Sequence, residues 1–152
     1  MHLKIFLLAL LLLSFNSSAD SGSRQKAISG EHRSTQHKNR DIYRNPQSTL
    51  DFFAVEPSMT VVEIWPGGKA WYTEILAPYL KDQGLLYAAH FDANSTVPYF
   101  SRNLDKFKHK LTASPDIYGK VIITTLQPPP LLEIAPENSA DRVLTFRNVQ
   151  TG

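Results

Sequence analysis

The chain contains no cysteine among its 152 residues. Disulfides, thiolate metal sites and lipid-modified cysteines are therefore excluded, and packing alone must stabilise the fold. A marked excess of one charge is also missing, because 16 lysines and arginines nearly balance 14 aspartates and glutamates for a net charge of +2. A balance this small argues against a general nucleic-acid binder. The histidines show no spacing typical of metal ligands, so we expect no metal.

Long apolar runs are missing except at the start of the chain. After Lys4, residues Ile5–Leu13 are all apolar, and small polar residues follow. This pattern is typical of a secretory signal peptide spanning residues 1–19, with cleavage after Ala19. A membrane anchor is the alternative, but the run falls well short of the roughly 20 residues that a span requires. We therefore expect a periplasmic or secreted protein with no stable membrane span after cleavage.

Residues 20–45 are polar, and their apolar side chains are too sparse to form a core. We predict a flexible lead-in for this segment. Its basic residues are interpreted as a solvated surface, and steering of an anionic ligand or a membrane surface is the alternative. Folded structure should begin near Pro46, because proline suits the first turn of a helix. The basic residues are Arg24, Lys26, Arg33, Lys38, Arg40 and Arg44.

From residue 46 to residue 152, apolar strand patterns alternate with helical ones. This alternation predicts an α/β fold, with an open, mostly parallel, Rossmann-like sheet of about four strands and flanking helices. Ligands of such sheets bind at the carboxyl ends of the strands. The predicted strands are Thr60–Trp65, Leu85–Phe91, Val121–Leu126 and Arg142–Phe146, and the main helices are Tyr72–Lys81 and Thr96–Thr112.

The end of the first strand combines an acid with glycines. Glu63 interrupts an otherwise apolar strand, where a buried carboxylate costs several kcal/mol unless a cation or a hydrogen-bond donor meets it. Trp65, Gly67 and Gly68 follow immediately. Glycine lets a ligand approach the backbone, and the start of the next helix offers N–H groups. This pattern indicates a ligand-binding turn, although the glycines are also compatible with a simple tight turn.

Polar side chains also follow the other strands. His90 and Asp92 come at the end of the second strand, Gln127 follows the third, and Arg147 and Asn148 follow the fourth. The carboxyl ends of parallel strands meet at one edge of a sheet, so we expect these side chains to converge. His90 has an alternative interpretation as a histidine whose hydrogen bonds are satisfied inside the body.

Four segments carry a resemblance to a known family: Thr60–Gly68, Trp71–Glu74, Leu86–Ala89 and Asp141–Val149. They resemble a bacterial group of exported class I S-adenosylmethionine-dependent methyltransferases. The resemblance covers roughly Asp41–Val149, and the last of the four segments is its most distinctive part.

The resemblance implies a role for each residue of the turn. Gly67 and Gly68 are expected to lie against the methionine part of S-adenosylmethionine, and Glu63 to hold its ammonium group. Trp65 and Asn148 are included among the expected cofactor-binding residues.

The resemblance also implies an acid at the end of the second strand that holds the ribose hydroxyls. His90 falls at the expected place, and Asp92 lies two residues further in the same strand phase. Asp92 is chemically preferable, because a carboxylate accepts from two hydroxyls at once. Gln127 stands near the position of an adenine-reading side chain.

Three features depart from the family pattern. After Val149 this chain reads Gln150-Thr151-Gly152, where relatives have a histidine and then Asn-Trp. Lys69 and Ala70 stand where relatives have one glycine, and the family fold continues with further strands after Val149. The expected function is therefore an S-adenosylmethionine-dependent methyltransferase in a truncated form, which we expect to be inactive. The alternative is a non-catalytic exported module that binds a small molecule or a protein with the same fold. The sequence identifies neither the methyl acceptor nor a catalytic residue.

Overall fold

The structure, a computed structural model, describes residues 21–127 and 131–146. The expected signal peptide, residues 1–19, and Asn148 lie outside these ranges. Within the described ranges, no helix combines the length and the apolar character that crossing a membrane requires.

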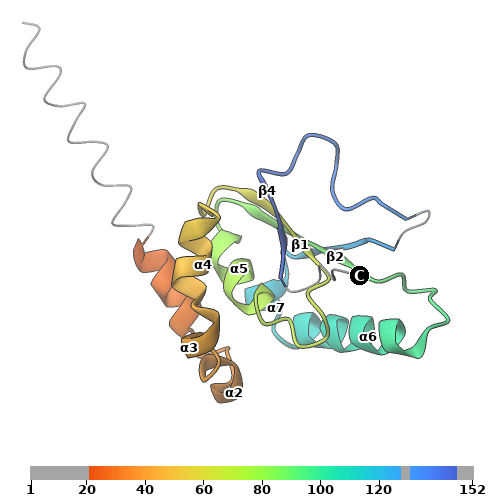
Figure 1. Cartoon of the computed structure of the whole chain (residues 1–152), viewed down its shortest axis with the longest axis horizontal. Coiled ribbons are helices and arrows are strands. Elements are labelled where there is room, and N and C mark those ends of the chain that lie inside the picture. Colours follow the sequence, from red (N-terminus) through yellow and green to blue (C-terminus); the bar gives the residue numbers. More distant parts are fainter. Residues whose placement is uncertain (1–20, 128–130, 147–152) are drawn as a thin grey trace, which may run out of the picture.

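Four parallel strands form one sheet in the spatial order β3-β2-β1-β4 (Figure 1). This order, with β1 and β2 in the middle, is that of a Rossmann-like sheet. The two central strands are largely buried, as expected for parallel strands covered on both faces. The predicted open, parallel α/β sheet is therefore confirmed. The strands are β1 (Thr60–Ile64), β2 (Leu85–His90), β3 (Ile122–Thr125) and β4 (Arg142–Thr145).

Helices precede the sheet and connect its strands. Residues 21–29 are helical, and three of the later helices begin with proline, whose fixed φ suits the first turn. The two main helices of the sequence prediction, α5 and α6, are confirmed. The helices are α2 (Thr35–Lys38), α3 (Asp41–Arg44), α4 (Pro46–Phe52), α5 (Thr73–Leu80), α6 (Pro98–Ala113) and α7 (Pro115–Tyr118).

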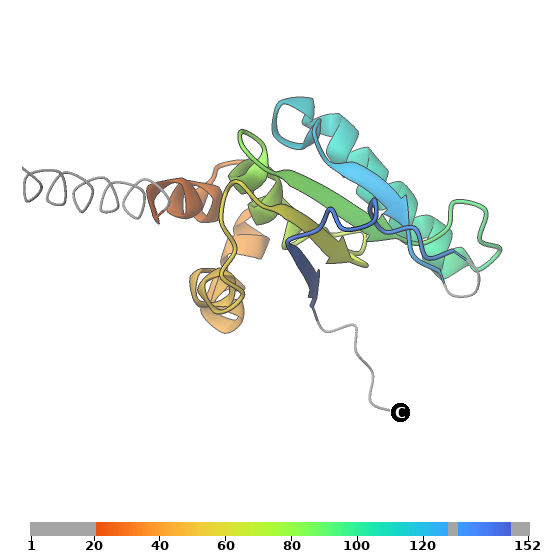
Figure 2. The ribbon, with the colours of Figure 1, turned by 90° about the horizontal axis from the view of Figure 1, so that it is seen from above.

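The two faces of the sheet are covered differently. On one face Val61 belongs to a buried cluster that includes Phe107 of α6, and Figure 2 shows α6 running alongside the sheet. On the other face Val62 and Tyr87 pack against Ile134, which belongs to the connection between β3 and β4. Because side chains alternate along a strand, Glu63 shares the helix-covered side with Val61. The first face therefore positions Glu63, the acid of the predicted ligand-binding turn.

The segment that the sequence predicted as a flexible lead-in is helical and packed instead. Ala27 and Ile28 belong to the main buried cluster, and Arg24 donates a hydrogen bond to the hydroxyl of Tyr79 at 3.1 Å. The partners of this segment lie far along the sequence, on α4 and α5, so its composition alone suggested a solvated tail. In Figure 1 these N-terminal helices lie beside α4 and α5.

A buried carboxylate anchors the same segment. Glu74, in the first turn of α5, is only 1% exposed. The Nδ1 atom of His37 lies 2.8 Å from its Oε2 atom, and Lys110 of α6 is paired with its Oε1 atom. Arg33 lies 3.7 Å from Oε2 and also forms a two-pronged ion pair with Asp41 at 2.8 Å. Glu74 thus joins the N-terminal helices to α5 and α6.

Replacing Glu74 by glutamine should destabilise the fold strongly. The variant removes the carboxylate that pairs with the half-buried Lys110 and leaves the buried Arg33 with Asp41 as its acidic partner. Breaking a buried ion pair on one side costs about 3 kcal/mol or more. Urea unfolding followed by circular dichroism measures the change. Glu56→Gln is the matched control, because Glu56 is exposed and its loss should change the unfolding free energy by less than about 0.5 kcal/mol. Equal midpoints for the two variants would show that Glu74 does not anchor the segment.

Candidate functional site

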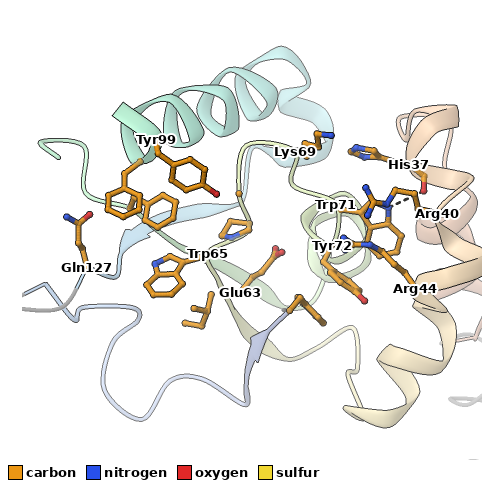
Figure 3. A pocket seen from close by; sticks show the side chains of 16 residues that line it. His37, Arg40, Arg44, Glu63, Trp65, Lys69, Trp71, Tyr72, Tyr99 and Gln127 are labelled. Carbon is orange, nitrogen blue, oxygen red and sulfur yellow. Dashed lines mark hydrogen bonds between the residues drawn. The ribbon is translucent and has the colours of Figure 1, made fainter. Parts of the chain in front are cut away.

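A cavity of about 890 Å³ lies at the carboxyl end of β1 (Figure 3). Its size falls within the range of small-molecule pockets, and its place is where open parallel sheets bind ligands. The lining comes from α2, α3, the turn between β1 and α5, the segment after β2, the start of α6 and the residues after β3 and β4. These residues are His37, Arg40, Arg44, Glu63, Ile64, Trp65, Pro66, Gly67, Lys69, Trp71, Tyr72, Phe91, Tyr99, Phe100, Gln127 and Phe146.

Glu63 provides the one carboxylate among the described residues that line the cavity. Its side chain is almost fully buried, with 2% of the residue exposed, and its Oε2 atom accepts a hydrogen bond from the Thr73 hydroxyl at 2.7 Å. Burial raises the pKa of Glu63 from 4.5 to about 7, against the smaller opposing effect of the Thr73 hydrogen bond. A cation that entered the cavity would favour the ionised form and lower this pKa again. Glu63 is therefore suited to pair with a positively charged group.

The two glycines of the turn have different roles. Gly67 has a φ of +68°, which glycine adopts without strain, and a Cβ atom at this position would meet nothing within 4 Å. Gly68 instead faces α6, because a Cβ there would lie 2.9 Å from the Cβ atom of Lys106. Its N–H group donates to Asn103 at 3.1 Å. Only Gly67 lines the cavity, whereas Gly68 allows the turn to pack closely against α6.

Trp65 begins an aromatic wall at one end of the cavity. Its φ of +47° is unusual for a large side chain, and such backbone strain is concentrated at functional sites. The indole N–H donates to the carbonyl of Leu126 at 2.8 Å, which holds the ring in place. Phe91 stacks on Trp65, with centroids 5.7 Å apart, and on Phe100, with centroids 4.3 Å apart. Gln127 lies at the same end of the cavity in Figure 3.

His90 does not line the cavity. It is fully buried, its Nδ1 atom accepts from the backbone N–H of Phe91 at 2.8 Å, and its ring lies beside that of Phe107. Burial and the charge of Lys108 lower the pKa of His90 to about 4, although the backbone of Gly67 acts in the opposite direction. His90 is therefore neutral at physiological pH and packs against Phe107 of α6, outside the cavity.

Asp92 also lies outside the cavity lining. Its carboxylate accepts from the N–H of Asn94 at 3.0 Å, and its own N–H donates to the side-chain oxygen of Gln127 at 3.0 Å. The structure thus brings together four of the expected site residues: Glu63, Trp65, Gly67 and Gln127. Asn148 is outside the described residues.

The sequence prediction missed the basic wall of the cavity. His37, Arg40 and Arg44 come from the segment interpreted as a solvated surface, and Lys69 comes from the longer turn. The guanidinium of Arg44 lies 4.7 Å from the centroid of the Trp71 ring, in cation–π geometry. The sequence signal for this wall was the group of basic residues in the polar segment 20–45. Steering of an anionic ligand was the alternative interpretation of those residues.

The stability of the protein should fall as the pH rises through the range in which Glu63 ionises. The folded pKa of about 7 lies above the ordinary value of 4.5, so the folded state holds the proton more tightly than the unfolded state does. The contribution of Glu63 to the free energy of unfolding is complete below pH 4.5 and is lost as the pH rises to about 7. The free energy of unfolding changes by about 3 kcal/mol over this range.

Glu63→Gln should lack this contribution, so the variant should gain stability relative to the wild type as the pH increases from 5 to 8. Urea unfolding of both proteins across this range measures the difference. Glu137→Gln, at an exposed position, controls for the lost charge. A difference that stays constant with pH would contradict the raised pKa of Glu63.

Comparison with known proteins gives a fold-level likeness. Neither a protein-family model nor a curated protein matches the sequence. Among solved structures, a protein-L-isoaspartate O-methyltransferase is similar, with 13% sequence identity and a TM-score of 0.47. The match covers 74% of this chain and 29% of that protein's chain. A likeness at this identity concerns the arrangement of the backbone only.

Proposed function

We propose that this chain binds S-adenosylmethionine in the cavity, in the manner of the exported class I methyltransferases that its sequence resembles. The observation that carries the proposal is the position of Glu63. A buried carboxylate with a pKa of about 7 stands at the carboxyl end of β1, beside a glycine whose cavity side is open. An acid placed there pairs favourably with the ammonium group of an amino-acid ligand.

The described residues fit the methionine end of the cofactor. Glu63 would hold the ammonium group, and Gly67 leaves space for the ligand against the backbone. Thr73 keeps the carboxylate oriented through its hydrogen bond. When bound, the cofactor supplies an activated methyl group.

The aromatic wall fits the adenosine end. Aromatic rings such as Trp65 and Phe91 offer flat surfaces on which a purine base stacks. The side-chain oxygen of Gln127 is engaged by the N–H of Asp92, which leaves the NH₂ group of the amide directed elsewhere as a donor. A donor of this kind can read a ring nitrogen of adenine.

The contribution of the protein to methyl transfer would be mainly orientation. Methyl transfer from a sulfonium needs the acceptor atom in line with the bond that breaks, and holding both reactants in one cavity supplies much of the rate enhancement. Burial of Glu63 also keeps water away from its carboxylate, which strengthens its pairing with a cation.

One observation favours the alternative, a non-catalytic module that binds another small molecule. Neither His90 nor Asp92 lines the cavity, so the described residues place no second acid for the ribose hydroxyls. A module of this kind would still use Glu63 and the aromatic wall, but for a cationic ligand without a ribose.

Isothermal titration of the mature protein with S-adenosylmethionine at pH 6 should show saturable binding. Glu63 is mostly protonated at this pH, and pairing with the ammonium group should expel about one proton. Titrations in two buffers of different ionisation enthalpy measure this release. Glu63→Gln should bind about tenfold more weakly and release no proton.

Glu133→Gln, an exposed acid on the connection after β3, should behave as the wild type. The absence of saturable binding would reject the cofactor. Binding with proton release in the Glu63→Gln variant would reject the role of Glu63. Binding of a cationic amine, without binding of the cofactor, would support the non-catalytic alternative.

We also propose that the chain is exported, on the basis of the apolar run Ile5–Leu13 and the small residues up to Ala19. Expression in a bacterial host should place the protein outside the cytoplasm, and N-terminal sequencing should find Asp20 as its first residue. Leu11→Arg interrupts the apolar run and should retain the protein inside the cell with residues 1–19 intact. Retention of the wild type with Met1 still present would contradict export.

A further inference from the structure

We propose that the basic wall of the cavity, formed by His37, Arg40, Arg44 and Lys69, is a subsite for an anionic group, and that the methyl acceptor is a small acidic molecule bearing a phosphate or carboxylate. The identification of the anion with a methyl acceptor rests on the proposed function, whereas the anion subsite itself does not. In Figure 3 the basic wall stands on the opposite side of the cavity from Gln127 and Tyr99.

The balance of charge in the cavity supports an anionic ligand. Arg40, Arg44 and Lys69 bring three basic side chains to the lining, and Glu63 is the one acid among the described lining residues. S-adenosylmethionine would not restore neutrality, because its sulfonium and ammonium groups outweigh its single carboxylate. A second ligand with negative charge is therefore favoured over a neutral or cationic one.

The acids closest to the basic wall are already engaged. Both oxygens of Asp41 accept from Arg33 at 2.8 Å, although Asp41 adjoins Arg40 in the sequence. Glu74 is buried and pairs with His37 and Lys110. These carboxylates hold the helices in place and are not directed at Arg40, which is exposed to the solvent.

Two members of the basic wall, His37 and Arg44, are held in place by their neighbours. His37 is held on two sides, because its side chain pairs with Glu74 and its carbonyl accepts from the Trp71 indole at 3.1 Å. The guanidinium of Arg44 stacks over Trp71 and lies 5.7 Å from the centroid of the Tyr72 ring. Stacking on two aromatic rings restricts the plane of the guanidinium to one orientation. His37 and Arg44 are thus preorganised, which reduces the entropic cost of binding an anion.

Binding of inorganic pyrophosphate, measured by NMR chemical shifts at constant ionic strength, tests the subsite. The titration is repeated with saturating S-adenosylhomocysteine, which occupies the cofactor end. The double variant Arg40→Gln with Arg44→Gln should weaken pyrophosphate binding at least about tenfold. The control, Lys26→Gln with Arg102→Gln, removes the same charge at two exposed positions away from the cavity and should bind as the wild type does.

We expect pyrophosphate to bind equally with and without S-adenosylhomocysteine, and the affinity for S-adenosylhomocysteine to be equal in both double variants. Equal losses in the two variants would show a general charge effect and overturn the subsite. Pyrophosphate and S-adenosylhomocysteine could instead compete, with weaker S-adenosylhomocysteine binding to the double variant Arg40→Gln with Arg44→Gln. This result would assign the basic wall to the carboxylate of the cofactor and overturn the proposal of an acidic methyl acceptor. Pyrophosphate binding without any binding of S-adenosylhomocysteine would keep the subsite and reject the methyltransferase.

Discussion

The ion pairs of the buried Glu74 carboxylate are the interaction on which the shape of the site depends. Glu74 belongs to α5, directly after the glycine turn, and it pairs with His37 of α2 and Lys110 of α6. A charge in the interior is tolerated only when it is fully partnered. The partners bring the N-terminal helices against the sheet, and those helices then supply one wall of the cavity. Without this anchor, the basic residues would project from a solvated segment.

Glu63 and Glu74 show how two buried acids in one short stretch have different consequences. Glu74 meets basic side chains inside the protein, so its charge stabilises the packing of α5. Glu63 meets a neutral hydroxyl from Thr73, and burial raises its pKa to about 7. A buried acid with a raised pKa lowers the stability of the fold at neutral pH. A cationic ligand that pairs with the carboxylate would restore part of this stability. The proposed cofactor supplies such a cation, and the basic wall is our proposed subsite for a second, anionic ligand.

Local patterns predicted the framework well because local physics determines it. Each strand carries a short apolar run, and α6 has apolar residues such as Leu104 and Phe107 at helical spacing. The strand-end rule then placed Glu63, Trp65 and Gln127 at one cavity. The same rule failed for His90, because the rule identifies the edge of the sheet but not the direction of each side chain. The side chain of His90 points toward α6 and packs against Phe107.

The sequence by itself determined the parallel sheet, the turn with its acid and glycine, and the place of the cavity. Hydrophobic periodicity is set by residues close together in the chain, and the alternation of strands with helices makes the strand pairing parallel. Only the tertiary structure decided that residues 21–44 are packed helices and that Arg40 and Arg44 face the cavity. The packing of these N-terminal helices depends on partners such as Glu74 and Tyr79, which lie tens of residues away along the chain. Composition within a segment cannot reveal a partner that only folding brings near.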